Sequence, residues 1–269
     1  MKLNFKKFGE GPALIILHGL YGSSDNWVNI GKELSDHFEV FLIDHRNHGG
    51  SPHTDEHNYT LLREDLNEFM EQQSISRATL LGHSMGGKAA MFFAAKYPEK
   101  IDNLIVVDIS PRSYKSPDKP APHTIDHLNV IQALMSVDFN KVDNRMDVDM
   151  VLAETIKSQR IRQFLLKNVK RKDKNSFCWK LNLKTLHDAM PAIMDGLDPA
   201  TINIGQGITG FPVLFIKGEN SDYISDPDFP LIRQLFPSAE IVTIPNAGHW
   251  VHAEQTELFM KNIRYFLAL

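Results

Sequence analysis

Short apolar runs recur along the chain, and most are followed by a stretch with the periodicity of an amphipathic helix. Runs that stay apolar over four or five consecutive positions are typical of parallel strands buried on both faces. Six such runs are expected to be strands: Ala13–Leu17, Val40–Ile43, Ala78–Leu81, Leu104–Asp108, Val213–Ile216 and Ile241–Ile244. Helices are expected between them, for example over Thr60–Met70 and Glu257–Leu267. This alternation predicts an α/β fold with a mostly parallel central sheet flanked by helices.

The alternation is interrupted once, where a proline-rich segment follows the strand that ends at Asp108. The next strand is expected only at Val213, and the stretch between is mostly helical in pattern. Its helices are expected over Ile125–Met135, Asp147–Ile156, Ile161–Leu166 and Leu183–Met194, with an extended piece near Ser176–Leu183. One alternative is a second, unrelated domain. Because the sheet pattern resumes afterwards, we instead expect a core of residues 1–111 and 205–269 with a helical cap inserted at residues 112–204.

Composition excludes several classes of protein. The 269 residues are 42% hydrophobic and 23% charged, which is typical of a soluble globular chain. The formal net charge of −4 argues against a nucleic-acid binder. The longest apolar runs are far shorter than a membrane span, and the first residues do not resemble a secretory signal. Cys178 is the only cysteine, so no internal disulfide can form. These features favour a cytoplasmic protein, and they predict no oligomeric state.

A serine lies where one of the predicted strands meets a predicted helix. Gly82-His83-Ser84-Met85-Gly86 matches the pattern G-x-S-x-G and follows the strand that begins at Ala78. A nucleophilic hydroxyl must project from a tight turn at the edge of the sheet, and small flanking residues are needed in such a crowded turn. The helix that follows directs backbone N–H groups toward an oxyanion. The pattern therefore predicts Ser84 as a nucleophile and the Met85 N–H as an oxyanion donor.

A second donor and a base are expected from two further loops. His18-Gly19-Leu20-Tyr21-Gly22 follows the first predicted strand, where sheet hydrolases place their other oxyanion donor. The Leu20 N–H is our candidate, with His18 ordering the loop. A histidine is expected after the last strand, and His249 occupies that position. It is the candidate general base.

Two aspartates compete for the role of the acid that orients His249. Asp108 stands at the end of one strand, and Asp222 lies in the loop after the next strand of the sheet pattern. The commoner slot for the acid in that second loop holds Ser221, one residue before Asp222. Because both strands end near the histidine loop, spacing leaves both aspartates open.

Five segments together resemble the α/β-hydrolase superfamily and, within it, the YbfF-type serine esterases. They are LHGLYGSSDNW (17–27), DHRNHGGSPH (44–53), GHSMGGKAAM (82–91), VVDISP (106–111) and PNAGHWVHAE (245–254). The resemblance implies a sheet core with a helical cap and a serine-dependent hydrolase acting on short-chain esters or thioesters, without a cofactor. It also implies that Asp108 is the acid, since family members often lack an aspartate in the later loop. This chain departs from them by carrying Asp222 as well.

The substrate itself is less constrained by the sequence. Phe139, Phe164, Trp179 and Trp250 are candidates for lining an acyl pocket, with ordinary packing as the alternative. No metal-binding signature is present, so no metal site is predicted. Two other functions stay open. One is different chemistry on the same fold, either C–C bond hydrolysis or the elimination carried out by a menaquinone-pathway lyase. The other is a non-catalytic receptor or scaffold.

Overall fold

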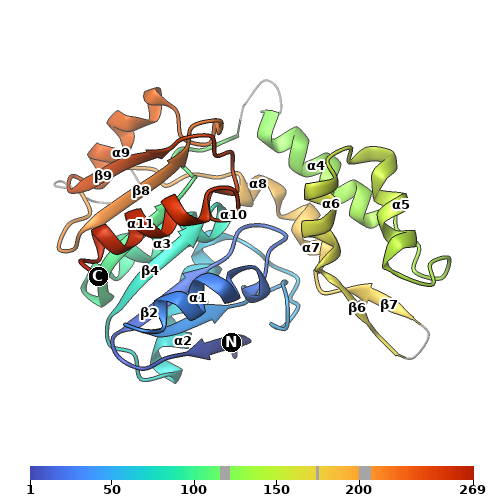
Figure 1. The fold of residues 1–269 in the computed structure, drawn as a ribbon, viewed down its shortest axis with the longest axis horizontal. Helices are drawn as coiled ribbons and strands as arrows, with labels where there is room; N and C mark the ends of the chain where they lie inside the picture. The colour runs from blue at the N-terminus through green and yellow to red at the C-terminus, as the bar shows by residue number, and fades with distance from the viewer. Residues whose placement is uncertain (116–121, 174–175, 200–206) are drawn as a thin grey trace.

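A seven-stranded sheet forms the centre of the computed structural model, which describes residues 1–115, 122–173, 176–199 and 207–269 (Figure 1). The strand order is β1-β3-β2-β4-β5-β8-β9, and only β1 runs antiparallel to its neighbour. The strands are β1 (Phe5–Phe8), β2 (Ala13–Leu17), β3 (Glu39–Ile43), β4 (Ala78–His83), β5 (Ile101–Val107), β8 (Val213–Gly218) and β9 (Ala239–Ile244). The predicted α/β class and all six predicted strands are confirmed.

Helices cover both faces of the sheet, as continuous apolar strands require. On one face, α1 (Val28–Leu34) and α11 (Thr256–Phe266) pack on alternate residues of the strands. On the other face lie α2 (Tyr59–Gln72), α3 (Met85–Lys96) and α9 (Phe229–Leu235). Four short helices complete this part: η1 (Ser24–Trp27), η2 (Pro98–Lys100), η3 (Asp226–Asp228) and α10 (Val251–Glu254). Within the described residues, no helix combines the length and the apolar content needed to cross a membrane.

The residues between β5 and β8 form a separate block, which we call the helical insertion (Figure 1). It contains α4 (Pro122–Met135), α5 (Arg145–Thr155), α6 (Gln159–Leu166), α7 (Leu183–Asp188) and α8 (Met190–Ile193). An antiparallel hairpin of β6 (Val169–Arg171) and β7 (Phe177–Trp179) lies between α6 and α7. The single helix expected over Leu183–Met194 is wrong, because Pro191 cannot continue a helix from its interior and instead lies in the first turn of α8. The expected core boundary at residues 204 and 205 lies outside the described residues.

The buried side chain of Lys88 connects the two ends of the helical insertion to α3, which packs on the sheet. The Tyr114 N–H donates to the Met194 carbonyl (2.8 Å), which joins the outgoing and returning chain segments. Lys88 on α3 donates from Nζ to the carbonyls of Arg112 (2.9 Å) and Asp195, one on each segment. Its ammonium group also lies 4.5 Å from the centre of the Tyr114 ring. Burial lowers the Lys88 pKa to about 7.

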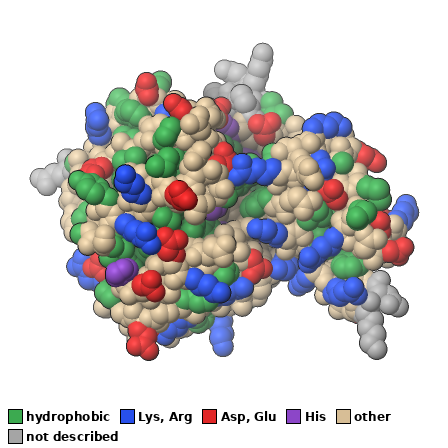
Figure 2. Space-filling view, viewed as in Figure 1, with side chains coloured by type: hydrophobic (Ala, Val, Ile, Leu, Met, Phe, Trp, Pro, Cys, Tyr) green, Lys and Arg blue, Asp and Glu red, His purple; other side chains and the backbone are tan. Residues whose placement is uncertain are grey.

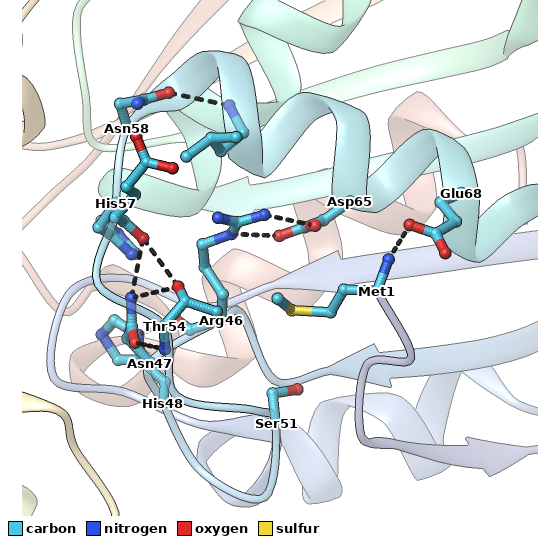
Figure 3. A network of polar contacts seen from close by, with 12 residues as sticks. Met1, Arg46, Asn47, His48, Ser51, Thr54, His57, Asn58, Asp65 and Glu68 are labelled. Carbon is cyan, nitrogen blue, oxygen red and sulfur yellow. Dashed lines mark hydrogen bonds and ion pairs between the residues drawn. The ribbon is translucent and has the colours of Figure 1, made fainter.

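The long loop between β3 and α2 is held by a polar network (Figure 3). The loop also makes a hydrogen bond to the helical insertion. Arg46 makes a bidentate ion pair with Asp65 of α2, with N···O distances of 2.6 and 2.8 Å. Asn58 caps the first turn of α2 by accepting from a backbone N–H. The main-chain carbonyl of Asn47 accepts from the N–H of Asn182, at the start of α7 (3.0 Å). The network therefore fixes this loop beside the carboxyl ends of the strands.

Candidate active site

Ser84 occupies the turn between β4 and α3, as predicted from G-x-S-x-G. Its backbone has φ +53° and ψ −121°, a conformation that L-residues adopt only at a cost of about 1–3 kcal/mol. The Ser84 N–H donates to the carbonyl of Val107 at the end of β5 (3.0 Å), which anchors the turn to the neighbouring strand. The side chain therefore stands at the carboxyl edge of the sheet, where it faces a cavity.

The glycines around Ser84 are required by the close approach of backbone segments. A Cβ at Gly86 would lie inside contact distance of the carbonyl oxygens of Leu17 and His18. A Cβ at Gly82 would collide in the same way with the backbone of Gly86. A methyl group at either glycine would clash with main-chain atoms, which cannot rotate away as a side chain can.

Gly86→Ala is expected to lower the free energy of unfolding by about 3 kcal/mol or more, because overpacking against rigid backbone has no cheap relaxation. Urea unfolding followed by circular dichroism measures the loss. Gly31→Ala in α1 is the matched control. The nearest atoms to its Cβ would be those of the Leu42 side chain, from 3.0 Å, and alanine favours the helix. Equal losses in the two variants would contradict this account of the turn.

His249 and Asp108 meet at the carboxyl ends of β5 and β8. Asp108 follows β5 in a left-handed conformation (φ +51°) and is fully buried. Its Oδ2 accepts a 2.8 Å hydrogen bond from Nδ1 of His249. Its Oδ1 accepts from the Gly218 N–H (2.9 Å), and the Ser221 hydroxyl donates to Oδ2. Because a carboxylate accepts and does not donate, His249 carries its proton on Nδ1 and leaves Nε2 with a lone pair.

Ser221 is a residue of this site that the sequence interpretation did not assign. Ser221 occupies the position in the loop after β8 where the acid more commonly stands. That position in the sequence could have identified it as a residue of the site. Asp222, the alternative acid, turns outward: its side chain is 80% exposed, and its carboxylate lies 3.6 Å from Nε2 of His123. The structure thus brings Asp108, with Ser221 as its partner, to the imidazole of His249.

Two aromatic neighbours hold the His249 imidazole and its loop. The ring of Tyr223 stacks on it, with centroids 4.0 Å apart and planes 24° apart. Nε2 of His83, the residue before Ser84, lies 2.8 Å from the His249 carbonyl. Since a carbonyl only accepts, His83 donates from Nε2, and burial holds its pKa well below the usual value, so the ring stays neutral. The strand that presents Ser84 therefore also positions the loop of His249.

The loop after β2 passes directly beside Ser84. A Cβ at Gly19 would lie 3.1 Å from the Ser84 Cβ, so only glycine lets the backbone come this close. The Gly19 carbonyl accepts from the Gly22 N–H (2.9 Å) and from Nδ1 of His18 (2.8 Å). Because a trans peptide holds its C=O and N–H antiparallel, these bonds also set the direction of the Leu20 N–H.

The hydrogen bonds of this loop require His18 to be neutral. His18 Nε2 accepts from the His45 N–H (3.1 Å), so the ring proton is on Nδ1, where it reaches the Gly19 carbonyl. Burial lowers the pKa of His18, which keeps this tautomer uncharged. On the other side of Ser84, Met85 is the first residue of α3, so its N–H has no partner within the helix. Leu20 and Met85 thus flank Ser84 from two elements.

A cavity of about 460 Å³ lies between the sheet and the helical insertion, where the surface is hollowed (Figure 2). Ser84, His249 and Leu20 line its floor, and the insertion supplies mostly apolar side chains to its walls: Val130, Ile156, Ile161, Phe164 and Leu165. Two predicted pocket residues are among the lining, Phe164 and Trp250, with ring centroids 5.7 Å apart.

The other two predicted pocket residues lie elsewhere, and the sequence interpretation is corrected on this point. Phe139 and Trp179 pack edge to face within the helical insertion, with centroids 5.3 Å apart. The indole Nε1 of Trp179 donates to the Leu134 carbonyl (3.0 Å). These half-buried rings pack against the apolar core of the insertion and do not line the cavity. In the described part of the chain, no group of three or more His, Cys, Asp or Glu side chains is arranged to hold a metal ion.

Comparisons with known proteins agree with this architecture. The family model for the alpha/beta hydrolase fold matches residues 12–256. The chain is 36% identical to the sn-1-specific diacylglycerol lipase ABHD11 of Mus musculus, over 96% of this chain and 81% of that protein. It is 32% identical to esterase YbfF of Escherichia coli, over 99% of each chain. A solved structure of a marine microorganism esterase superposes with a TM-score of 0.93 at 45% identity, covering 98% of this chain and 99% of that one. By sequence and by fold, the chain belongs to the α/β-hydrolase family, among its esterases.

Proposed function

We propose that the chain hydrolyses carboxylic esters through an acyl-enzyme intermediate on Ser84, with His249 as general base and Asp108 as the acid that orients it. The observation that carries the proposal is the hydrogen bond from His249 Nδ1 to the buried Asp108 carboxylate, beside the cavity that Ser84 also lines. That bond leaves Nε2 free to accept the Ser84 proton. The helical insertion serves as the cap over this cavity.

In the first half of the reaction, Nε2 of His249 takes the Ser84 proton as Oγ attacks the ester carbonyl carbon. The carbonyl oxygen becomes an oxyanion, which the N–H groups of Leu20 and Met85 stabilise. The imidazolium is stabilised by Asp108. The tetrahedral intermediate then collapses, and the alcohol leaves with the proton from His249.

In the second half, water replaces the alcohol. His249 takes a proton from the water as its oxygen attacks the acyl carbonyl, and the same two N–H groups hold the second oxyanion. Collapse releases the carboxylic acid, and the proton returns from His249 to Ser84 Oγ. The chain's own residues account for each proton transfer.

The cavity supports a substrate with an apolar acyl group. More than half of the lining residues that the helical insertion supplies are aliphatic or aromatic, and the size of the cavity lies in the range of small-molecule sites. The name of the mouse relative adds glycerolipid esters to the classes worth testing. Thioesters share the same carbonyl chemistry, with a thiol as the leaving group. We therefore propose short-chain and medium-chain esters as the primary class, with thioesters second.

A fluorophosphonate probe and nitrophenyl esters test the proposal together. The wild-type protein is expected to be labelled on Ser84 and to release nitrophenol from acetate and butyrate esters, whereas Ser84→Ala abolishes labelling. A panel of acyl lengths, with diacylglycerol and acyl-CoA as separate arms, then defines the leaving group and the chain preference. Wild-type protein that neither labels nor turns over any ester would support a receptor or scaffold instead. Labelling without ester turnover would favour C–C bond hydrolysis or the lyase.

A further inference from the structure

The loop that carries Leu20 is held from outside the sheet by the helical insertion. The hydroxyl of Tyr21, the next residue, donates to the main-chain carbonyl of His127 in α4 (3.0 Å). The side-chain amide of Asn168, between α6 and β6, donates to the main-chain carbonyl of Tyr21 (2.8 Å). Tyr21 and Asn168 are both buried, so water does not compete strongly for these two bonds.

Tyr21 also has a strained backbone that needs such restraints. Its φ of +62° lies in the left-handed region, which costs an aromatic residue free energy and persists only where the surroundings enforce it. Asn168 is well suited to enforce it, because the second N–H of its amide is used by the Leu165 carbonyl (3.2 Å) and the group cannot easily turn. Two restraints on the Tyr21 conformation therefore come from the helical insertion, in addition to the bond from the Gly22 N–H to the Gly19 carbonyl within the loop.

We propose that Tyr21 and Asn168 are positioning residues for the oxyanion hole, so that the helical insertion shapes the catalytic geometry as well as covering the cavity. The inference rests on the proposed esterase function. The Leu20 N–H lies between two fixed carbonyls: His18 holds that of Gly19 from within the sheet domain, and Asn168 holds that of Tyr21 from the insertion. Releasing the second lets the Tyr21–Gly22 peptide relax, which weakens the bond from the Gly22 N–H to the Gly19 carbonyl. The Gly19–Leu20 peptide, which carries the Leu20 N–H, then turns away from the substrate.

A misdirected Leu20 N–H is expected to lower the stability of the transition state. The substrate carbonyl oxygen gains full negative charge only as Oγ attacks, so a misdirected N–H weakens transition-state binding more than substrate binding. Tyr21→Phe, which removes only the hydroxyl, and Asn168→Ala are each expected to lower kcat for nitrophenyl acetate about fivefold to tenfold, as the loss of one buried hydrogen bond implies. The KM is expected to change by less than about twofold.

A transition-state analogue separates positioning from general loosening of the fold. An aryl trifluoromethyl ketone forms a tetrahedral adduct on Ser84 that places an oxyanion in the hole. Its inhibition constant is expected to rise in proportion to the fall in kcat/KM in both variants. Because the two residues act on the same loop, the double variant is expected to lose less than the product of the single losses.

Tyr59→Phe is the matched control. The Tyr59 hydroxyl makes the same kind of buried bond to the insertion, to the Ile193 carbonyl (2.7 Å), and this tyrosine belongs to α2. Its kcat and its ketone affinity are expected to stay at wild-type values. Unchanged kcat in Tyr21→Phe and Asn168→Ala, or equal losses in Tyr59→Phe, overturns the inference and leaves the esterase proposal intact. Wild-type protein without ester turnover overturns both.

Discussion

Asp108→Asn is expected to lower kcat by about four orders of magnitude, as removal of the charge at a triad aspartate does elsewhere. Three donors converge on this carboxylate: the Gly218 N–H, the Ser221 hydroxyl and Nδ1 of His249. An asparagine amide offers one oxygen and one NH₂ group. The backbone N–H of Gly218 cannot turn away, so the amide oxygen takes the place of Oδ1 and the NH₂ group faces His249. The imidazole then adopts the other tautomer, with its proton on Nε2 and no lone pair for Ser84.

Asp222→Asn is the control for this prediction. Its carboxylate is 80% exposed and lies beside His123, so kcat with nitrophenyl acetate is expected to stay within about twofold of wild type. Steady-state kinetics on both variants measures the two changes in kcat, and circular dichroism confirms that each variant is folded. A large loss confined to Asp222→Asn would show that the loop rearranges in solution and that the acid has been assigned to the wrong residue.

The strands and the positions of Ser84 and His249 after them were predictable because their signals are local. A continuous apolar run marks a buried parallel strand, and the G-x-S-x-G turn and the loop of His249 each follow such a strand directly. The edge strand Phe5–Phe8 was missed for the same reason: with two lysines in four residues and only partial burial, it carries no such run. Pro191 was a local signal for the break between α7 and α8, but the helical periodicity of the residues around it obscured that signal.

The choice of acid and the walls of the cavity depend on contacts that a single sequence does not display. Asp108 and Asp222 both follow strands that are neighbours in the sheet, and what separates them is the left-handed turn at Asp108 and the donor at Gly218. The resemblance to known esterases favoured Asp108, whereas spacing left both open. Phe139 and Trp179 look like pocket residues by composition, yet they pack on each other, because a helical insertion of this size needs its own apolar interior.

Acid is expected to unfold this protein steeply, because six histidines are buried in the neutral form and a seventh, the half-buried His127, has its pKa lowered in the same way. Burial lowers the pKa of each, to about 3 for three of them: His57, His127 and His252. The other four follow the same direction: His18, His45, His48 and His83. The rings of His18 and His83 hold the proposed oxyanion loop and the loop of His249 as uncharged groups. A ring nitrogen of each of four others has no hydrogen-bond partner in the described part of the chain, so a proton there would be a buried charge without an acceptor: His45, His48, His57 and His252.

The sign follows from proton linkage. In the unfolded chain these histidines regain a pKa near 6.5, so below that pH the unfolded state binds more protons than the folded state. Their contribution to stability is therefore complete above about pH 7.5 and is lost as the pH falls through 6.5 toward 3. Each of the three histidines with a folded-state pKa of about 3 costs about 1 kcal/mol between pH 7 and pH 5.5, and the other four act in the same direction. The loss is a large share of the roughly 5–15 kcal/mol that holds a domain folded.

Urea unfolding at pH 8, 7, 6 and 5.5 measures the effect, with a fall of about 3 kcal/mol or more expected between pH 7 and pH 5.5. Imidazole nitrogen NMR supplies the matching observation on the folded protein, where these rings are expected to stay neutral at pH 6. Rings that titrate near pH 6.5 in the folded state, or a free energy of unfolding that stays level across this range, would contradict the prediction. The same linkage sets a condition on the enzyme assays: activity lost below pH 6 has to be checked against unfolding before it is attributed to protonation of His249.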